Sequence, residues 1–385
     1  MGRVKAEVNE ETDRNILTIL SMNGRVTLDF IGGKVGLSKH PTYRRIKMLE
    51  ERYGIRYIPE IDVSKFGYFG YVVFVKFRNK VPSLGEILKA LDAEPRVQLV
   101  LLTSGDYDLI IYFLSNNHRD VAYFTFKLFS GDTFAPYPSD WYITPHYTAN
   151  FIPLRDKFFE LLKTKIWRKT KNKKRPESED LIEREFNVLR ELNRNGAVNF
   201  TEIDAKYKQG IGASRYAYFK LKERGILKRV TISLNNLPIK YHSIFIINFF
   251  YGMKFSKTRP NLLSDIIKDG PIINKYTHIG EIGIPMGVML VMPVFNDYEV
   301  NETEDYIEKK INGVAFKKLV VTRIPIGSFA YRRFDKTYTN QYRLLVEEYK
   351  TLKTQEKPDY ENQQKPKKKT PYVMELTESN DNETT

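Results

Sequence analysis

Apolar positions recur at helical spacing in two stretches of the chain that lie about 172 residues apart. In the first, Ile16, Leu17 and Leu20 recur at the interval of an amphipathic helix, and Asn23-Gly24 is expected to end it. The second stretch has the same Asn-Gly stop at Asn195-Gly196, and two further short helical patterns follow each stop. A long fixed period of this kind predicts a duplicated unit.

The first stretch predicts three helices joined by short turns. Thr12 is expected to cap the first helix and Thr27 the second, which must end near Gly36. Ser38 is then expected to cap a third helix that runs to about Arg52. The intervening turn has the length that joins the two helices of a DNA-binding helix-turn-helix.

The third predicted helix has one face for packing and one for a partner. Thr42, Ile46, Leu49 and Tyr53 share the face that should pack on the first two helices. The opposite face is basic and carries Lys39, His40, Tyr43, Arg44, Arg45 and Lys47. Such a face suits the major groove of DNA, where Arg and Lys bond guanine edges or phosphates. The alternative is a solvated surface helix without a partner.

The second copy has diverged at the corresponding helix. Its residues Ser214, Tyr218 and Leu221 are predicted to face inward. The predicted outer face holds Arg215, Tyr216, Phe219 and Lys220. Gly210 and Gly212 stand near the position of Ser38, and Tyr216-Ala217 replaces Arg44-Arg45. Weaker DNA binding, a different half-site and a structural role all remain open, and Phe219 favours a protein contact.

A strand-helix-strand-strand-helix-strand pattern follows each helical cluster. The first copy has predicted strands at 66–77, 97–102, 108–114 and 141–147, with helices at 83–93 and 119–129. The second has strands at 244–250, 272–279, 286–294 and 318–325, with helices at 261–269 and 304–311. This order is ferredoxin-like. The predicted fold class is therefore α+β, with two winged helix-turn-helix domains alternating with two ferredoxin-like (β-α-β-β-α-β) domains.

These patterns also predict the domain boundaries. They place a winged helix-turn-helix at 1–62, a ferredoxin-like domain at 63–152, a helical and basic linker at 153–177, a diverged winged helix-turn-helix at 178–238, a second ferredoxin-like domain at 239–335, a C-terminal helix at 336–350 and a disordered tail at 351–385. Residues 163–175 of the linker hold eight Lys or Arg and no acid. We expect this arm either to lie along DNA phosphates or to be a solvated linker.

Composition narrows the function classes. The 385 residues include 62 Lys and Arg against 47 Asp and Glu, a net charge of +15 that favours anionic partners. The absence of Cys excludes disulfides and thiolate chemistry. No apolar run predicts a signal peptide or a membrane span, so we expect a cytoplasmic, nucleoid-associated protein. The five histidines are scattered and no phosphate-binding loop is present, so we expect no metal, no cofactor and no enzymatic activity.

A family resemblance rests on the third helix of the first copy. Gly36-Leu37-Ser38, Pro41-Thr42-Tyr43-Arg44-Arg45-Ile46 and Leu49-Glu50 together resemble the recognition-helix signature of the Lrp/AsnC (feast/famine) transcription regulators. Thr12-Asp13-Arg14-Asn15-Ile16-Leu17 resembles the opening of that family, and the likeness extends over roughly residues 10–335. It implies a sequence-specific DNA-binding transcription regulator whose partner is double-stranded DNA and whose α/β domains mediate dimerisation. The implied DNA contacts are Ser38, Lys39, His40, Tyr43, Arg44, Arg45 and Lys47, with Arg215, Tyr216 and Lys220 in the second copy.

The resemblance also implies a small-molecule effector such as an amino acid. Gly105, Asp106 and Asp108 stand where the family has its Gly-x-x-Asp effector loop. A hairpin turn that needs no ligand explains the same residues. The second copy has Gly280-Glu281-Ile282-Gly283 at its expected loop, without the second Asp, so we expect no effector there. Fusion of two units predicts an internal pseudo-dimer, with a homo-oligomer as a further option.

One enzyme class enters as an alternative. The sirohaem decarboxylases of haem biosynthesis resemble this family and also occur as two fused copies, with a His- and Tyr-rich stretch on the middle strands of the α/β domain. This chain has Leu101-Leu102-Thr103-Ser104 in that place, and Thr277-His278-Ile279-Gly280 in the second copy. The enzyme interpretation is therefore the weaker one.

Overall fold

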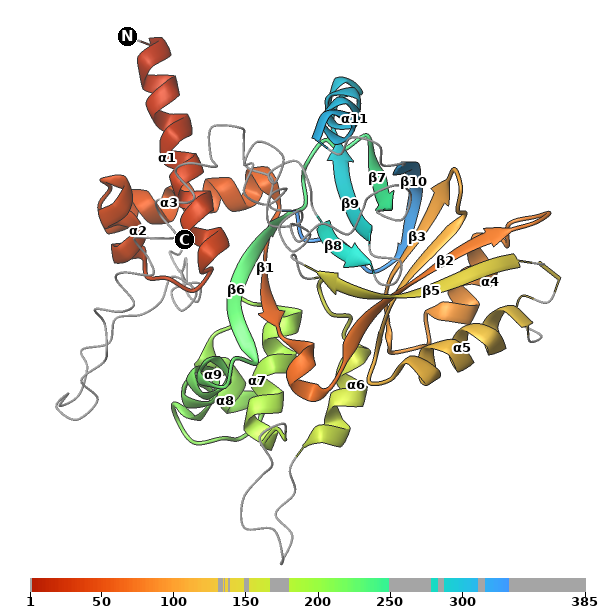
Figure 1. The fold of residues 1–385 in the computed structure, drawn as a ribbon. Coiled ribbons are helices and arrows are strands. Elements are labelled where there is room, and N and C mark those ends of the chain that lie inside the picture. The colour runs from red at the N-terminus through yellow and green to blue at the C-terminus, as the bar shows by residue number, and fades with distance from the viewer. Residues whose placement is uncertain are drawn as a thin grey trace, which may run out of the picture. The chain divides into compact units, whose positions relative to one another are not determined.

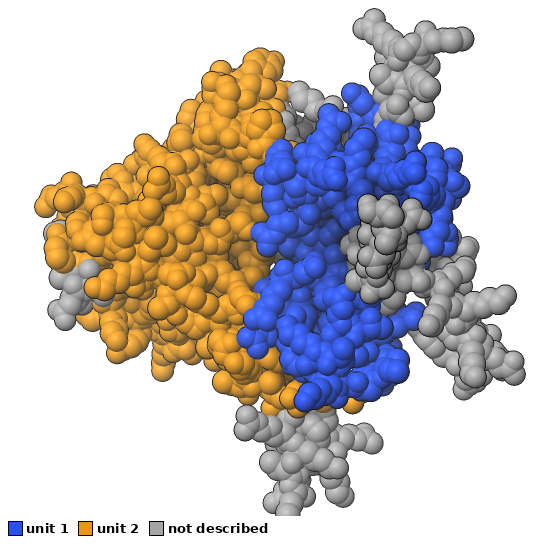
Figure 2. Space-filling view, turned by 180° about the vertical axis from the view of Figure 1, so that it is seen from behind, with its two compact units in different colours: residues 1–60, 187–236, 334–385 blue, residues 61–186, 237–333 orange. Residues whose placement is uncertain are grey.

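The computed structural model describes residues 2–130, 134, 136–137, 139–148, 152–166, 180–248, 278–282, 287–310 and 316–331. The chain forms two compact units, and each unit takes residues from both copies. The helix unit joins residues 1–60 with 187–236, and the barrel unit joins 61–186 with 237–333 (Figure 2). No described helix is long and apolar enough to cross a membrane.

The helix unit contains two three-helix clusters and a two-stranded sheet. The first cluster is α1 (Gly2–Met22), α2 (Leu28–Val35) and α3 (Lys39–Tyr53), and the second is α7 (Glu183–Arg194), α8 (Phe200–Lys206) and α9 (Ala213–Glu223). β1 (Ile55–Ile61) follows the first cluster and β6 (Leu227–Leu234) the second. The two strands pair with each other, so a sheet formed between the copies joins the clusters (Figure 1).

The capping predictions for the first cluster have different outcomes. Thr27 is the N-cap of α2, where its side chain accepts from the Phe30 N–H, and Gly36 ends that helix at φ 72°. Thr12 lies inside α1, which begins at Gly2, so its predicted cap role is wrong. The residues before Thr12 include Lys, Ala and Glu and no Pro, and these favour continuation of the helix.

Both Asn-Gly turns lie against the strand of the other copy. The Gly24 N–H donates to the Val230 carbonyl at 2.7 Å, and the Gly196 N–H donates to the Tyr57 carbonyl at 2.9 Å. A Cβ on Gly196 would lie 2.7 Å from the carbonyl oxygen of Tyr57, closer than packing allows. These glycines therefore hold the two copies together as well as ending helices.

Arg25 makes a further contact between the copies. Its Nη1 donates to the carbonyls of Gly196 (2.8 Å) and Val198 (2.9 Å), and its guanidinium lies 4.1 Å from the centre of the Phe200 ring. The side chain is buried, and this burial lowers the pKa of Arg25 to about 10. An arginine of the first copy is thus built into the second helix cluster.

The barrel unit contains the α/β elements of both copies. The first copy supplies β2 (Phe69–Phe77), α4 (Leu84–Leu91), β3 (Val97–Ser104), β4 (Leu109–Ser115), α5 (His118–Ser130) and β5 (Ser139–Thr148). The second supplies β7 (Tyr241–Asn248), β8 (His278–Ile282), β9 (Gly287–Val294), α11 (Tyr298–Lys310) and β10 (Phe316–Ile326). The first copy has the predicted ferredoxin-like order. The helix predicted at 261–269, the C-terminal helix at 336–350 and the tail at 351–385 lie outside the described residues.

The eight strands close into one barrel in the order β10-β3-β4-β2-β5-β8-β9-β7. Each copy contributes four neighbouring strands, and the two sets join at β5–β8 and at β10–β3, both antiparallel. At these junctions His146 pairs with Ile282, and Val320 pairs with Ser104. Each copy therefore covers the sheet edges of the other, which is the arrangement of an internal pseudo-dimer.

Strand residues of alternating position fill two different apolar layers. On β4, Leu109, Ile111 and Phe113 pack in the cluster that includes Ile87 of α4 and Val121 of α5. The alternate residues Ile110, Tyr112 and Leu114 are also buried. Because successive strand side chains point to opposite faces, this second set faces the barrel interior, which side chains fill in a barrel of eight strands.

The predicted loop of the second copy is displaced. Gly280 and Glu281 lie within β8, where Gly280 pairs with Thr148 on one side and Met289 on the other. Sequence reasoning placed a turn at this glycine, but pairing with strands on both sides keeps it extended. The loop between β8 and β9 falls at residues 283–286, outside the described residues.

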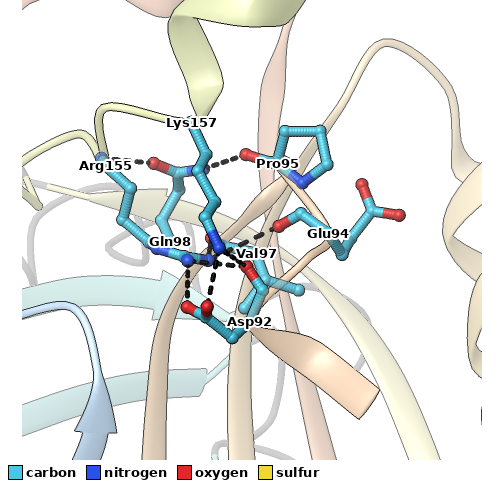
Figure 3. Close-up of polar contacts among 7 residues, drawn as sticks. All are labelled: Asp92, Glu94, Pro95, Val97, Gln98, Arg155 and Lys157. Carbon is cyan, nitrogen blue, oxygen red and sulfur yellow. Dashed lines mark hydrogen bonds and ion pairs between the residues drawn. The ribbon is translucent and has the colours of Figure 1, made fainter. Parts of the chain in front are cut away.

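A polar network anchors the connector that follows β5. Arg155 donates to Asp92 Oδ1 (2.6 Å) and to the carbonyls of Asp92 and Val97 (both 2.8 Å), while its N–H donates to Gln98 Oε1 (Figure 3). Lys157 bonds the other oxygen of Asp92 at 2.6 Å. The network precedes α6 (Phe158–Leu162), whose Phe158 and Phe159 are fully buried. The start of the linker is therefore a fixed part of the barrel unit.

Candidate nucleic-acid interface

Helix α3 presents one exposed face and one buried face, as its sequence predicts. Thr42, Ile46 and Leu49 are buried. The exposed residues are Ser38, Lys39, His40, Pro41, Arg44 and Met48, while Tyr43, Arg45 and Lys47 are half-buried. Lys47 Nζ lies 6.0 Å from the centre of the Tyr43 ring. The exposed face is thus polar and basic near the start of the helix.

Two of the predicted DNA contacts are engaged inside the cluster. Arg45 Nε donates to Asp13 Oδ1 of α1 at 2.5 Å, and the side chain of Asp13 is 13% exposed. Lys47 pairs with Glu50 at 3.0 Å. Residues one position apart are separated by about 100° around a helix. Arg44 therefore points to solvent while the neighbouring Arg45 fixes α3 on α1.

The N-terminus of α3 is open to solvent. Ser38 is its N-cap residue, but the Ser38 side chain makes no capping hydrogen bond, and the first turn holds no acidic residue. Thr42 Oγ1 donates to the Ser38 carbonyl at 2.9 Å, which keeps the start of the helix in place. Pro41 has no N–H, so the first-turn donors of this helix are the N–H groups of Lys39 and His40, and such groups favour an anion.

Helix α9 has a different N-terminus. The buried side chain of Asp204 accepts hydrogen bonds from the N–H groups of Gly212 and Ser214, both at 2.8 Å. A carboxylate therefore satisfies the start of this helix. Ser214, Ala217, Tyr218 and Leu221 are buried, and Arg215, Tyr216 and Phe219 are exposed, as the spacing predicts. Lys220, also predicted to face outward, is half-buried and pairs with Glu223 at 2.7 Å.

The loop predicted to bind an effector is closed by internal contacts. Asp108 accepts from Lys76 Nζ (2.9 Å) and from the Phe77 N–H (2.9 Å). Asp106 pairs with Lys317 of β10 at 2.9 Å. Gly105 has φ 127°, and a Cβ there would lie 2.8 Å from Leu319 Cδ2. The predicted residues Gly105, Asp106 and Asp108 are thus together, and each contacts the protein itself.

Two histidines of the barrel unit each lie against a tyrosine. The ring of His146 is edge-on to Tyr112 at 5.3 Å, and His242 Nε2 lies 2.9 Å from the Tyr331 hydroxyl. Burial lowers the pKa of His242 to about 4 and raises the pKa of Tyr331 to about 12. Sequence reasoning treated these histidines as scattered, but strand alternation would have placed His146 with Tyr142 on one face of β5. The described residues contain no cluster of metal ligands.

Comparison with known proteins identifies the family. An AsnC-type helix-turn-helix domain model matches residues 10–50, which reach from α1 to α3. The transcriptional regulator LrpA of Pyrococcus horikoshii is 30% identical over 114 residues, which are 29% of this chain and 80% of LrpA. This chain belongs to the Lrp/AsnC family of transcription regulators. The regulator FL11 of Pyrococcus furiosus is also similar, with 27% identity over 116 residues, 30% of this chain and 76% of FL11.

The fused arrangement of this Lrp/AsnC protein has a solved counterpart. The sirohaem decarboxylase NirDL has a TM-score of 0.55 and 14% sequence identity, covering 88% of this chain and 99% of NirDL. At this identity the likeness shows the fold alone. The Lrp/AsnC relatives match about a third of the chain, whereas the duplicated fold matches most of it.

Proposed function

We propose that this protein is a sequence-specific DNA-binding transcription regulator in which α3 enters the major groove. The observation that carries the proposal is the exposed face of α3: Ser38, Lys39, His40 and Arg44 stand together beside a helix N-terminus without an acid. Arg donates bidentately to guanine, and first-turn N–H groups bond phosphate. Arg45 and Lys47 act mainly within the first helix cluster. A DNA-binding role would put the protein on the nucleoid.

Arg44→Ala tests this proposal. It should weaken binding to a selected DNA site by about 1–3 kcal/mol, because it removes an exposed base or phosphate contact without disturbing the core. Arg119→Ala is the matched control, since Arg119 is an exposed arginine of α5 in the barrel unit. Fluorescence anisotropy with labelled duplexes at fixed salt measures both. Equal loss for the two variants would count against α3 as the recognition helix.

We also propose that the Gly105–Asp108 loop is the place where a small amino-acid effector would act. Such a ligand must displace Lys76 from Asp108 or Lys317 from Asp106, because both carboxylates are already paired. Lys317 belongs to the second copy, so displacement would loosen a junction of the barrel. Thermal shift with each amino acid, repeated on Asp108→Asn, tests this. A stabilising ligand whose effect survives in the variant binds elsewhere.

Sirohaem decarboxylation is not proposed. The likeness to NirDL is one of fold, and the residues 101–106 carry no His or Tyr. On β3 the interior face carries the buried Leu99 and Leu101, and the Tyr112 that pairs with Leu99 lies against His146. A visible-spectrum titration with sirohaem that gave stoichiometric binding would reopen the enzyme interpretation.

A further inference from the structure

The second copy carries the residue types of the first recognition helix in exchanged positions. A shift of 172 residues superposes the buried residues of the two clusters, such as Thr42 on Ser214 and Leu49 on Leu221. A backbone bond supports this register, because Leu37 N donates to the Gly32 carbonyl (2.9 Å) and Gln209 N to the Asp204 carbonyl (2.8 Å). The outer positions of α3 and α9 can therefore be compared one by one.

Two neighbouring pairs on the outer face are reversed. Tyr43-Arg44 of α3 corresponds to Arg215-Tyr216 of α9, and Lys47-Met48 corresponds to Phe219-Lys220. Each helix thus carries one stripe of Tyr and Lys and one stripe of Arg and an apolar residue. In the first stripe the Lys Nζ lies over the Tyr ring in both helices, at 6.0 Å in α3 and 5.7 Å in α9. Because adjacent residues are about 100° apart, the two stripes have changed sides.

The second helix-turn-helix has kept the charge of the first. Residues 28–52 and 200–224 each hold six Lys or Arg and three Asp or Glu. Tyr216 is 57% exposed and Phe219 is 43% exposed, so core packing does not explain these aromatics. Arg215 lies 5.9 Å from the Phe219 ring. A basic helix with an exposed aromatic row complements the major groove, where apolar side chains contact the thymine methyl group.

The two helices differ in which part can meet DNA. The Asp204 carboxylate occupies the N-terminus of α9 and would repel a phosphate there. Contact by α9 must therefore come from the stripes along the helix, beginning at Arg215. Helix α3, with its open N-terminus, can use its first turn as well.

The contacts between the copies hold both helices in one unit. Gly24, Gly196 and Arg25 bond across the copies, and Thr231 Oγ1 donates to the Ser21 carbonyl at 2.6 Å. These bonds fix the spacing of α3 and α9 within the helix unit, so any two half-sites that they recognise must have a fixed spacing as well.

We propose that α9 is a second recognition helix with its own base preference, so that the protein binds an asymmetric operator. One half-site is recognised by α3, and the other, which contains thymine contacted by Phe219, is recognised by α9. This inference rests on the proposed DNA-binding function, and it replaces the palindrome expected of two equal copies.

Selection of duplexes from a random DNA library, with sequencing of the bound pool, tests the proposal on the full chain. The wild type should select a motif of two dissimilar halves. Arg44→Ala should relax base preference about 5- to 150-fold in one half, and Arg215→Ala should do so in the other. Deoxyuridine in place of thymine in the second half should weaken wild-type binding and leave Phe219→Ala unaffected.

An exchange variant separates recognition from folding. This variant restores the residue order of α3 by four substitutions: Arg215→Tyr, Tyr216→Arg, Phe219→Lys and Lys220→Met. It should make the two halves of the selected motif more alike. A misfolded α9 cannot produce that result. Two outcomes would overturn the inference and leave the proposed function standing. One is a palindromic wild-type motif, and the other is a motif that is lost in Arg44→Ala but unchanged in Arg215→Ala. Absence of any selected motif refutes both.

Discussion

Replacing Arg25 should uncouple the two helix clusters. Arg25→Ala removes two charge-assisted hydrogen bonds of about 1.5–3 kcal/mol each and a ring contact of about 1 kcal/mol. It also relieves the cost of burying the charge, since the fall of the Arg25 pKa to about 10 corresponds to about 3 kcal/mol. The free energy of unfolding of the helix unit should therefore fall by about 1–4 kcal/mol.

Urea denaturation followed by far-UV circular dichroism measures this loss. Hydrogen exchange of the peptides that contain β1 and β6 should speed up, because the anchor lies beside that sheet. Arg56→Ala is the matched control, since it removes an exposed arginine from the same unit and should change stability by less than about 0.5 kcal/mol. Arg25→Met keeps the side-chain volume without donors or charge. Wild-type stability in Arg25→Met would refute the reasoning, because burial of the charge would then cancel its bonds.

Three further predictions concern pH, the connector and the basic arm. Burial favours neutral His242, so the folded protein loses stability as pH falls from 6.5 towards 4. Between pH 7 and pH 5 the wild type should lose about 2 kcal/mol of unfolding free energy that His242→Gln retains, measured by tryptophan fluorescence in urea. Arg155→Ala should lower the unfolding free energy by about 2–3 kcal/mol in the same assay and Lys157→Ala by less than about 1 kcal/mol, because Arg155 is the more buried of the two. Equal losses in the two variants would contradict this expectation. Neutralising Lys169, Lys171, Lys173 and Lys174 of the arm, which lie outside the described residues, should make DNA binding less dependent on salt. The salt exponent should fall by about 0.9 for each phosphate that is no longer neutralised, and an unchanged slope would mark the arm as a linker.

Local spacing predicted the elements well, because apolar periodicity and caps are properties of short segments. The burial of Thr42, Ile46 and Leu49 and the inner face of α9 follow from the three-to-four-residue interval alone. The Thr12 cap was wrong because nothing in the preceding residues stops a helix. The turn at Gly280 was wrong because pairing on both sides of β8 overrode a local signal.

Contacts between the copies could not be predicted from local patterns. The junctions β5–β8 and β10–β3 join strands that are far apart in the sequence and have no turn between them. Arg25 follows an Asn-Gly stop and has no periodic partner, so its role depends wholly on the fold. The same holds for Arg45, whose partner Asp13 lies 32 residues away. The exchanged stripes of α3 and α9 could have been read from an alignment of the copies, but their exposure could not.

The Arg25 contact also sets a condition on the two copies of the unit. Arg25 corresponds to Ala197 in the second copy, and its two acceptor carbonyls, of Gly196 and Val198, flank that alanine. In a homodimer of identical chains the same arginine would stand at both positions, so that two like charges would approach each other across the symmetry axis. The contact therefore requires two copies that are allowed to differ. A single chain that carries both copies meets this condition, because each copy has its own residue at the position: Arg25 in one and Ala197 in the other.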